Sequence, residues 1–316
     1  MKKALLFAGM ILMAAGLMAQ EQKEVLTGDG YANDVYYSLE NGTVTTVQRD
    51  NWDIGFITQV YSISILANNG SGVELYTYSN GTINDWASLD TSGMLWKPMY
   101  NSLETWDMGA FSANETGHPD YGWGTYSSAI ITGDSLYVIK TISGAYKKLA
   151  IVEKAAMANT WEFKYANLDG TEEQTVTLEA NDYPDPGFIH YSLDSMKFQE
   201  REPATEDWDL LFTKYYDYTI PYSVTGVLTN EDHIVAQEVS GADLDQATHV
   251  EFEDTSFVSH ISIIGSDWKK FDMGSMAYVL SDTTVFFVKK YTEAEDSLYY
   301  KIYFTGFSGS MGGGIY

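Results

Sequence analysis

The chain has 316 residues, of which 45% are hydrophobic and 20% charged, and it carries a formal net charge of −26. A surface with this charge makes nucleic acids and anionic membranes poor partners. The absence of cysteine excludes disulfides, thiol nucleophiles, thiolate metal sites and a lipid-bearing cysteine.

The N-terminal segment reads "MKKALLFAGMILMAAGLMAQ", with two lysines, an apolar run and small residues at its end. This pattern predicts a signal peptide over residues 1–19, cleaved after Ala19. The apolar run is short for a membrane span, which needs about 20 residues, and no later segment is apolar enough to cross a bilayer. We therefore expect an exported protein without a spanning segment, released, held at the outer cell surface or located in the periplasm.

A short sequence then occurs twice, as "DNWDIGF" at 50–56 and "EDWDLLF" at 206–212. In each copy, Trp and the two apolar residues that follow it alternate with other residues, a pattern typical of a half-buried β-strand. Each copy is thus expected to be a core strand. The alternation places Asp53 and Asp209 on the opposite, outward face.

The surroundings of this sequence are repeated in the same order. "VYYSL" precedes the first copy and "IHYSL" the second, while "ITGDSLYVIK" at 131–140 corresponds to "LSDTTVFFVK" at 280–289. We infer a tandem duplication with two all-β domains, at 20–180 and 181–316. Aligned on the last hairpins, the second copy ends partway through its final strand, either because that strand is short or because the chain is a fragment.

Turn signals and paired strands mark hairpins within these domains. Asn-Gly pairs at 41–42, 69–70 and 80–81 lie between alternating stretches and predict tight hairpin turns. "SLYVIKT" is expected to pair with "YKKLAIVE", and "TVFFVKKY" with "LYYKIYFTGF". No amphipathic helix is predicted after residue 20.

A search for catalytic motifs is negative. The chain has no G-x-S-x-G, no H-E-x-x-H and no glycine-rich phosphate loop. Its acidic pairs fit turns and solvated strand faces better than calcium loops. A catalytic carboxylate pair like that of a glycosidase is not excluded by the sequence, but no pattern selects one pair. A lone histidine is more often structural than a ligand, and the chain has five: His118, His190, His233, His249 and His260. The expectation is a protein that is not an enzyme.

The order Tyr-Ser-Leu, turn, Trp-Asp-aliphatic and then "NNGSGVELY" resembles the opening of HmuY-type haem-binding proteins. The later stretch "SDWKKFDMGSMAYVLSDTTVFFVKKY" at 266–291 resembles the final part of that family. The resemblance covers both halves of the chain after the signal. It implies an HmuY-like all-β fold and a secreted or surface protein that captures haem for iron acquisition.

In that family two axial side chains, usually His or Met, hold the haem iron. Carried onto this sequence, the resemblance implies Met273 as one axial ligand and His249 as the other. Histidine and methionine form a sound pair for haem iron. Lys269 and Lys270 are close enough in sequence to meet the propionates. The first copy has Ser128 at the corresponding position, or Met108 in a second alignment, so haem is expected in the second domain, with a haem-carrying protein or an outer-membrane receptor as partner.

Two further functions remain open. Aromatic residues on loops could stack on sugars, which would suit a secreted adhesion, glycan-contact or structural surface protein without haem; the tryptophans concerned are Trp86, Trp96, Trp106 and Trp123. A hydrolase with a carboxylate pair has only the general acidity of the chain in its favour.

Overall fold

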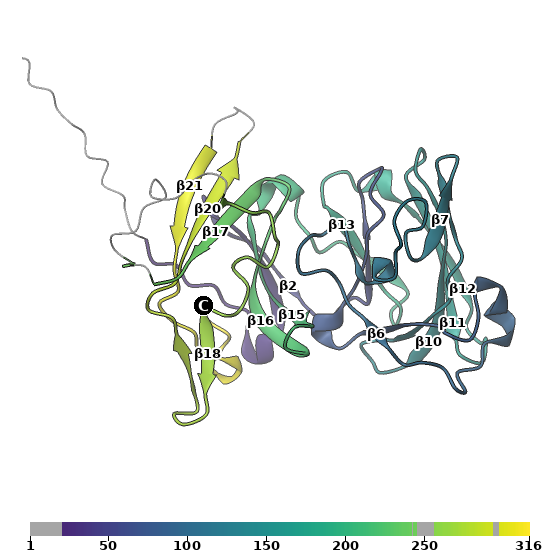
Figure 1. The fold of residues 1–316 in the computed structure, drawn as a ribbon, viewed down its shortest axis with the longest axis horizontal. Coiled ribbons are helices and arrows are strands. Elements are labelled where there is room, and N and C mark those ends of the chain that lie inside the picture. Colours follow the sequence, from purple (N-terminus) through teal and green to yellow (C-terminus); the bar gives the residue numbers. More distant parts are fainter. Residues whose placement is uncertain (1–20, 242, 245–255, 293–296) are drawn as a thin grey trace, which may run out of the picture.

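The computed structural model describes residues 21–241, 243–244, 256–292 and 297–316, so the predicted signal peptide and His249 lie outside the described residues. This part of the chain forms antiparallel β-sheets and short 3-10 turns (Figure 1), which confirms the all-β expectation. The short turns are η1 (Asp29–Tyr31), η2 (Asn69–Ser71), η3 (Ile83–Ser88), η4 (Ala110–Ser112), η5 (Ala180–Asp182), η6 (Thr205–Asp207) and η9 (Ser310–Gly312). In the described residues, no helix has the length and apolar character needed to cross a membrane.

The largest sheet belongs to the first half of the chain. Its strand order is β12 (Gln174–Glu179), β11 (Thr160–Asn167), β10 (Tyr146–Ala155), β9 (Tyr137–Lys140), β5 (Glu74–Thr77) and β6 (Pro98–Met99). The hairpin of β7 (Gly124–Ser127) and β8 (Ile130–Gly133) joins this sheet through β10. Along β11, Trp161, Phe163 and Tyr165 are fully buried while the residues between them are half-buried, so the strand shows the expected period of two.

The second half forms a smaller outer sheet, with the order β17 (Ile234–Val239), β20 (Val285–Tyr291) and β21 (Ser297–Ile302). A separate hairpin consists of β18 (Lys269–Asp272) and β19 (Ala277–Leu280) and projects away from this sheet (Figure 1). Both predicted strand pairings, now β9 with β10 and β20 with β21, are confirmed.

Two four-stranded sheets contain strands from both halves of the chain. One has the order β16 (Tyr222–Thr229), β15 (Leu210–Asp217), β1 (Asn33–Ser38) and β2 (Gly42–Gln48). The other has the order β14 (Lys197–Gln199), β13 (Phe188–Ser192), β3 (Ile54–Ile57) and β4 (Ile65–Ala67). β1 and β13, the strands of the two Tyr-Ser-Leu sequences, are therefore exchanged: each pairs with the strand that follows the Trp-Asp sequence of the other half.

This exchange changes the expected domain organisation. The core of the first half includes Phe188, Ile189 and Tyr191 from β13, and the core of the second half includes Val35 and Tyr37 from β1. The expected boundary between residues 180 and 181 thus does not separate the cores. Strand alternation specifies which face of a strand is buried but not which strand lies beside it, so the sequence pattern did not reveal the exchange.

Asp53 and Asp209 are buried, with no exposed surface, so their predicted outward position is wrong. Asp53 accepts hydrogen bonds from the backbone N–H of Leu193 at 2.7 Å and of Ile142 at 2.9 Å. Asp209 accepts one from the N–H of Leu39 at 2.7 Å. Each carboxylate faces the turn that follows the Tyr-Ser-Leu strand of the other half. This turn supplies a backbone N–H group that is not bonded within the sheet, and the carboxylate accepts its hydrogen bond.

The two Trp-Asp strands have equivalent backbone contacts. The N–H of Asp53 donates to the carbonyl of Tyr191, and the N–H of Asp209 donates to the carbonyl of Tyr37. The side-chain amides of Asn68 and Asn230 donate to the carbonyls of Trp52 and Trp208 respectively. These matched contacts support the duplication hypothesis.

The three Asn-Gly pairs have different structures. Asn41-Gly42 lies in the turn between the paired strands β1 and β2, as predicted. Asn69-Gly70 belongs to η2, between β4 and β5, which lie in different sheets. Asn80-Gly81 follows β5 and precedes η3. Only the first pair therefore forms the expected hairpin.

Candidate ligand-binding cleft between the two cores

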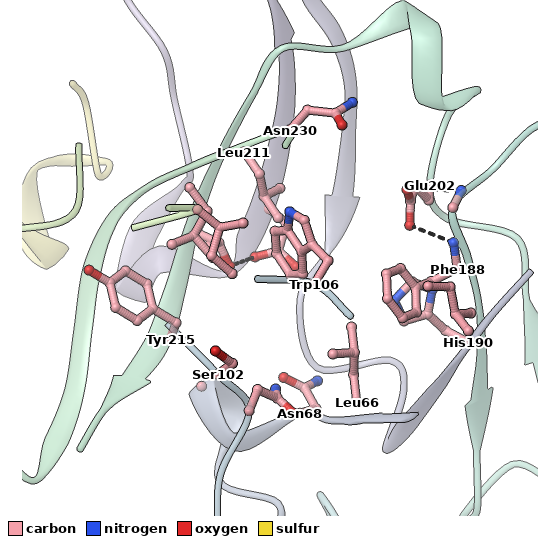
Figure 2. A pocket seen from close by; sticks show the side chains of 18 of the residues that line it. Leu66, Asn68, Ser102, Trp106, Phe188, His190, Glu202, Leu211, Tyr215 and Asn230 are labelled. Carbon is pink, nitrogen blue, oxygen red and sulfur yellow. Dashed lines mark hydrogen bonds between the residues drawn. The ribbon is translucent and has the colours of Figure 1, made fainter. Parts of the chain in front are cut away.

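A cleft lies where the two cores meet, and residues from both halves line it. It holds about 1190 Å³ of space between its lining atoms, including the part open to solvent. Figure 2 shows side chains from both mixed sheets and from the loops around it. Its aromatic lining includes Tyr36, Trp52, Trp106, Phe188, His190 and Trp208.

Two aromatic pairs occupy equivalent places in this lining. Trp52 packs edge to face on His190, with ring centroids 4.4 Å apart and an angle of 75° between the planes. Trp208 packs on Tyr36 at 5.1 Å and 78°. Because β1 and β13 are exchanged, each pair joins a tryptophan of one half to a ring of the other, and the exchange itself therefore brings these rings to the cleft.

A loop over residues 100–107, here named the strap, leaves the first half and contacts the second. The side chain of Glu231 accepts hydrogen bonds from the backbone N–H of Trp106 at 2.5 Å and from the hydroxyl of Thr105 at 2.8 Å. The indole N–H of Trp106 donates to the carbonyl of Thr229 at 3.0 Å. The rings of Tyr100 and Tyr216 are stacked at 4.0 Å. These contacts fix the orientation of Trp106 in the cleft.

The indole of Trp106 packs against the hydrophobic clusters of both mixed sheets. Its ring centroid lies 6.3 Å from that of Phe188. In Figure 2, Trp106 lies between Leu211 and Tyr215 on one side and Phe188 and His190 on the other. The side chain is only half-buried, so part of the ring is available to a ligand.

The buried charges at the cleft are held by specific partners. Arg201 forms an ion pair with Asp34 at 2.6 Å, and Asp34 also accepts a hydrogen bond from Thr213 at 2.6 Å. Glu202 accepts hydrogen bonds from the backbone N–H groups of Gly187 and Phe188, both at 3.2 Å. Burial outweighs these bonds and raises the pKa of Glu202 to about 8, so this carboxyl is largely neutral at pH 7.

Other titratable groups in the cleft are also shifted by burial. Burial raises the pKa of both Glu231 and Asp232. Burial, together with the charge of Arg201, lowers the pKa of His190 well below its usual value, so the imidazole is neutral at pH 7. Glu202 and Glu231 both hold loop backbone through their carboxyl oxygens. These two carboxyl groups thus have a structural role in the wall of the cleft.

Four buried nitrogen atoms of the lining have no hydrogen-bond partner among the described residues. These atoms are the indole Nε1 of Trp52 and of Trp208, Nδ1 of His190 and Nε of Arg201. All four side chains are more than nine-tenths buried. A buried polar group without a partner costs about 1–3 kcal/mol, and such groups in native proteins call for an explanation. The two unpartnered indole nitrogens occupy equivalent positions in the two halves.

The predicted haem residues lie elsewhere. Met273 is in the turn between β18 and β19, where its side chain is 74% exposed. Lys270 is exposed on β18. Lys269 is buried: its Nζ donates to the carbonyl of Thr225 at 2.5 Å and lies 4.2 Å from the ring centroid of Trp268. Burial lowers the pKa of Lys269 to about 7. Its amine therefore points into the protein and not toward a propionate at the surface.

The remaining candidates have varied surroundings. Among the tryptophans expected on loops, only Trp106 lines the cleft. Trp123 is fully buried in the first core, Trp86 packs against Lys148 and Lys164, and Trp96 is 44% exposed beside Tyr76 and Tyr146. Ser128 lies in the turn between β7 and β8, and Met108 directly follows the strap.

Sequence reasoning missed the cleft residues Arg201, Glu202 and Glu231. They lie in loops without a periodic pattern, so no local signal distinguished them from the many acidic and basic residues of the surface. The repeated tryptophans were the available signal, because both Trp52 and Trp208 line the cleft. In the described part of the chain, no group of three or more acidic or histidine side chains could hold a metal ion.

No protein-family model, no curated protein and no solved structure matches this chain. The resemblance to HmuY-type proteins therefore stays a prediction from the sequence.

Proposed function

We propose that this chain is an exported, non-catalytic binding protein that holds a small ligand in the cleft between its two cores. The observation that supports the proposal most is the aromatic lining of the cleft, in which the half-buried indole of Trp106 packs against the hydrophobic clusters of both mixed sheets. A largely preformed cleft with aromatic walls and a few polar groups is typical of small-molecule sites.

The contacts of the carboxyl groups favour binding over catalysis. Glu202 and Glu231 each accept hydrogen bonds from backbone N–H groups of loops that form the cleft. A carboxyl group that holds a loop in this way positions the cleft wall. The proposal therefore assigns these residues to shaping the site.

A ligand screen by thermal unfolding tests this proposal. A ligand of the cleft raises the unfolding temperature of the wild-type protein, because it binds only the folded state. Trp106→Ala reduces that shift, since it removes the half-buried ring that lines the cleft. Trp86→Ala is the matched control, because Trp86 does not line the cleft. A screen without any stabilising ligand, or equal shifts in both variants, would contradict the proposal.

Haem is a second candidate ligand, at a different place in the protein. The exposed thioether of Met273 favours it, because a sulfur atom in a projecting hairpin is accessible to haem iron. Together with the resemblance to HmuY-type proteins, this supports a haem-capture protein for iron acquisition, with His249 as the other axial residue. Its partners would be haem, a haem-carrying protein or an outer-membrane receptor, and its location outside the inner membrane.

Titration with haemin, followed by the Soret band in both redox states, tests the haem proposal. Met273→Ala and His249→Ala are each expected to weaken the band. Met276→Ala is the matched control, since this methionine lies in the same turn and is 69% exposed. A Soret band that does not shift in the wild-type protein would remove haem as a ligand. Equal bands in all three variants would remove only the two residue assignments.

A further inference from the structure

The strap places one tyrosine face to face with a tyrosine of the second half. The rings of Tyr100, at the start of the strap, and Tyr216, in β15, are stacked with centroids 4.0 Å apart and an angle of 4° between their planes. Burial, and next a hydrogen bond between the two hydroxyl groups, raises the pKa of Tyr100. This bond requires both hydroxyls to lie at the same end of the stack. The ring carbons next to them, the ortho carbons, are therefore neighbours as well.

This stack differs from the usual arrangement of aromatic pairs. Such pairs prefer offset or edge-to-face arrangements, with centroids about 4.5–7 Å apart. Tyr165 and Tyr191 in the first core follow that preference: their rings are 6.0 Å apart at 62°, although their hydroxyl oxygens are only 3.1 Å from each other. The stack of Tyr100 and Tyr216 is closer than this range and nearly parallel, so it presents two phenol faces to each other.

The backbone on each side holds the two rings in place. Tyr216 belongs to the part of β15 that pairs with β16. In the strap, the side-chain amide of Asn101 donates to the carbonyl of Ala67 at 2.8 Å. The hydroxyl of Ser262 donates to the carbonyl of Leu103 at 2.6 Å. Both stacked rings are half-buried, so the pair is preorganised and still within reach of a reagent in solution.

We propose that Tyr100 and Tyr216 form a modification site, at which a one-electron oxidant, such as a peroxidase supplied with hydrogen peroxide, joins the two rings as dityrosine. Each phenol gives one electron to the oxidant and one proton to water, which leaves two phenoxyl radicals. The radicals form a bond between one ortho carbon of each ring. Each of these carbons then loses its proton, while its phenolic oxygen regains one. With hydrogen peroxide as the terminal oxidant, the products are one dityrosine and two water molecules.

The stack favours this reaction, and the reaction in turn joins the two halves. Coupling of two radicals needs the rings to meet, and the stack supplies this contact in advance. The new bond ties the strap, which belongs to the first half, to β15 of the second half. A covalent link between residues far apart in the sequence stabilises the folded state by restricting the unfolded chain. The inference does not depend on a ligand in the cleft.

Oxidation of the full chain by a peroxidase and hydrogen peroxide, at low protein concentration, tests the proposal. We expect the blue fluorescence of dityrosine within single chains. Proteolysis and mass spectrometry should find a fragment with Tyr100 joined to a fragment with Tyr216, lighter by two hydrogen atoms. Tyr100→Phe and Tyr216→Phe are each expected to lower the yield within a chain at least about tenfold, because the ring that remains has no preorganised phenol beside it. Tyr218→Phe is the matched control and should keep the yield, since Tyr218 lies close to Tyr216 in the sequence and is 45% exposed.

Urea separates the effect of the fold from the reactivity of tyrosine in general. We expect the link between Tyr100 and Tyr216 to lose its preference over other tyrosine pairs when the chain is oxidised in its unfolded state. Linked wild-type protein should unfold at a higher urea concentration than untreated protein, whereas oxidised Tyr216→Phe protein should not. Dityrosine at other positions, with none between Tyr100 and Tyr216, would overturn the proposal. It would also be overturned if no link formed within the folded chain while free tyrosine in the same solution was converted.

Discussion

In the first half of the chain the hairpin β7–β8 pairs with β10 and becomes part of the large sheet, whereas in the second half the hairpin β18–β19 pairs with no other named strand in the described residues. Ile131 of β8 is buried in the first core, while its counterpart in the repeat, Leu280 of β19, is only partly buried against the second core. The two halves share the contacts of their Trp-Asp strands and differ in their outer sheets. Both halves therefore keep matched core contacts, and in the described residues only the first half has its hairpin paired into a larger sheet.

The buried aspartates differ in a related way. The Asp53 carboxylate accepts from the backbone N–H groups of Leu193 and Ile142. Asp209 accepts from the backbone of Leu39 and also contacts the side chains of Lys290 and His233, both at 2.9 Å. The second half thus adds side-chain partners where the first half uses backbone alone. This difference makes the two positions a matched pair for mutation.

The largest expected effect is the loss of Asp209. Asp209→Ala leaves the largely buried amine of Lys290 without its closest partner and is expected to lower the free energy of unfolding by about 3–5 kcal/mol. Asp53→Ala leaves two backbone N–H groups unpaired and is expected to cost about 2–3 kcal/mol. Urea unfolding measures both. Equal losses would show that the side-chain partners of Asp209 add no stability.

The next effect compares the two hairpins. Ile131→Ala opens a cavity in the first core and is expected to cost about 2–4 kcal/mol. Val279→Ala removes an exposed side chain and should change the free energy of unfolding by less than about 0.5 kcal/mol. The same urea titrations measure these changes. A large loss for Val279→Ala would mean that the exposed face of β18–β19 also packs against another part of the protein.

The smallest effect is a difference in pH dependence. Hydrogen bonds from His233 and Lys290 outweigh burial and lower the pKa of Asp209 below its ordinary value of 3.8, so its stabilising contribution is present above 3.8 and is lost as the pH falls through the lowered pKa. Burial raises the pKa of Asp53 above 3.8, so its contribution falls as the pH rises from 3.8 through the raised pKa.

Asn variants isolate these two slopes. Asp209→Asn is expected to reduce the loss of stability on acidification below pH 3.8, and Asp53→Asn to reduce the loss as the pH rises above it. Unfolding free energies measured across this range give both slopes. The change in slope relative to the wild-type protein is expected to have opposite signs in the two variants. Changes of the same sign would contradict the opposite pKa shifts.

Strand positions and local pairings could be predicted from the sequence, because alternating apolar residues and short turns are local features. The pairs β9–β10 and β20–β21 are examples. The exchange of β1 and β13 could not be predicted, since each of these strands has the same buried face beside either partner. The burial of Asp53 and Asp209 depends on the turns that follow the exchanged strands, so alternation alone placed them on the wrong side.

The candidate site was less accessible to sequence reasoning. Trp52 and Trp208 were recognised as core-strand residues, but their unpaired indole nitrogens depend on the position of the other half. Arg201 and Glu231 lie in loops whose role appears only when the strap and the exchanged strands are in place. The cleft is a product of how the two halves meet, which no single segment encodes.

The exchange of β1 and β13 between the two cores is the central claim, and fragment reconstitution tests it most directly. The chain is produced as two fragments, residues 21–180 and 181–316, and each is examined alone and mixed by circular dichroism and urea unfolding. We expect neither fragment alone to unfold cooperatively, since each lacks strands of its own core, and the mixture to form a one-to-one complex that does. Cooperative unfolding of the isolated 21–180 fragment, unchanged by its partner, would contradict the exchange.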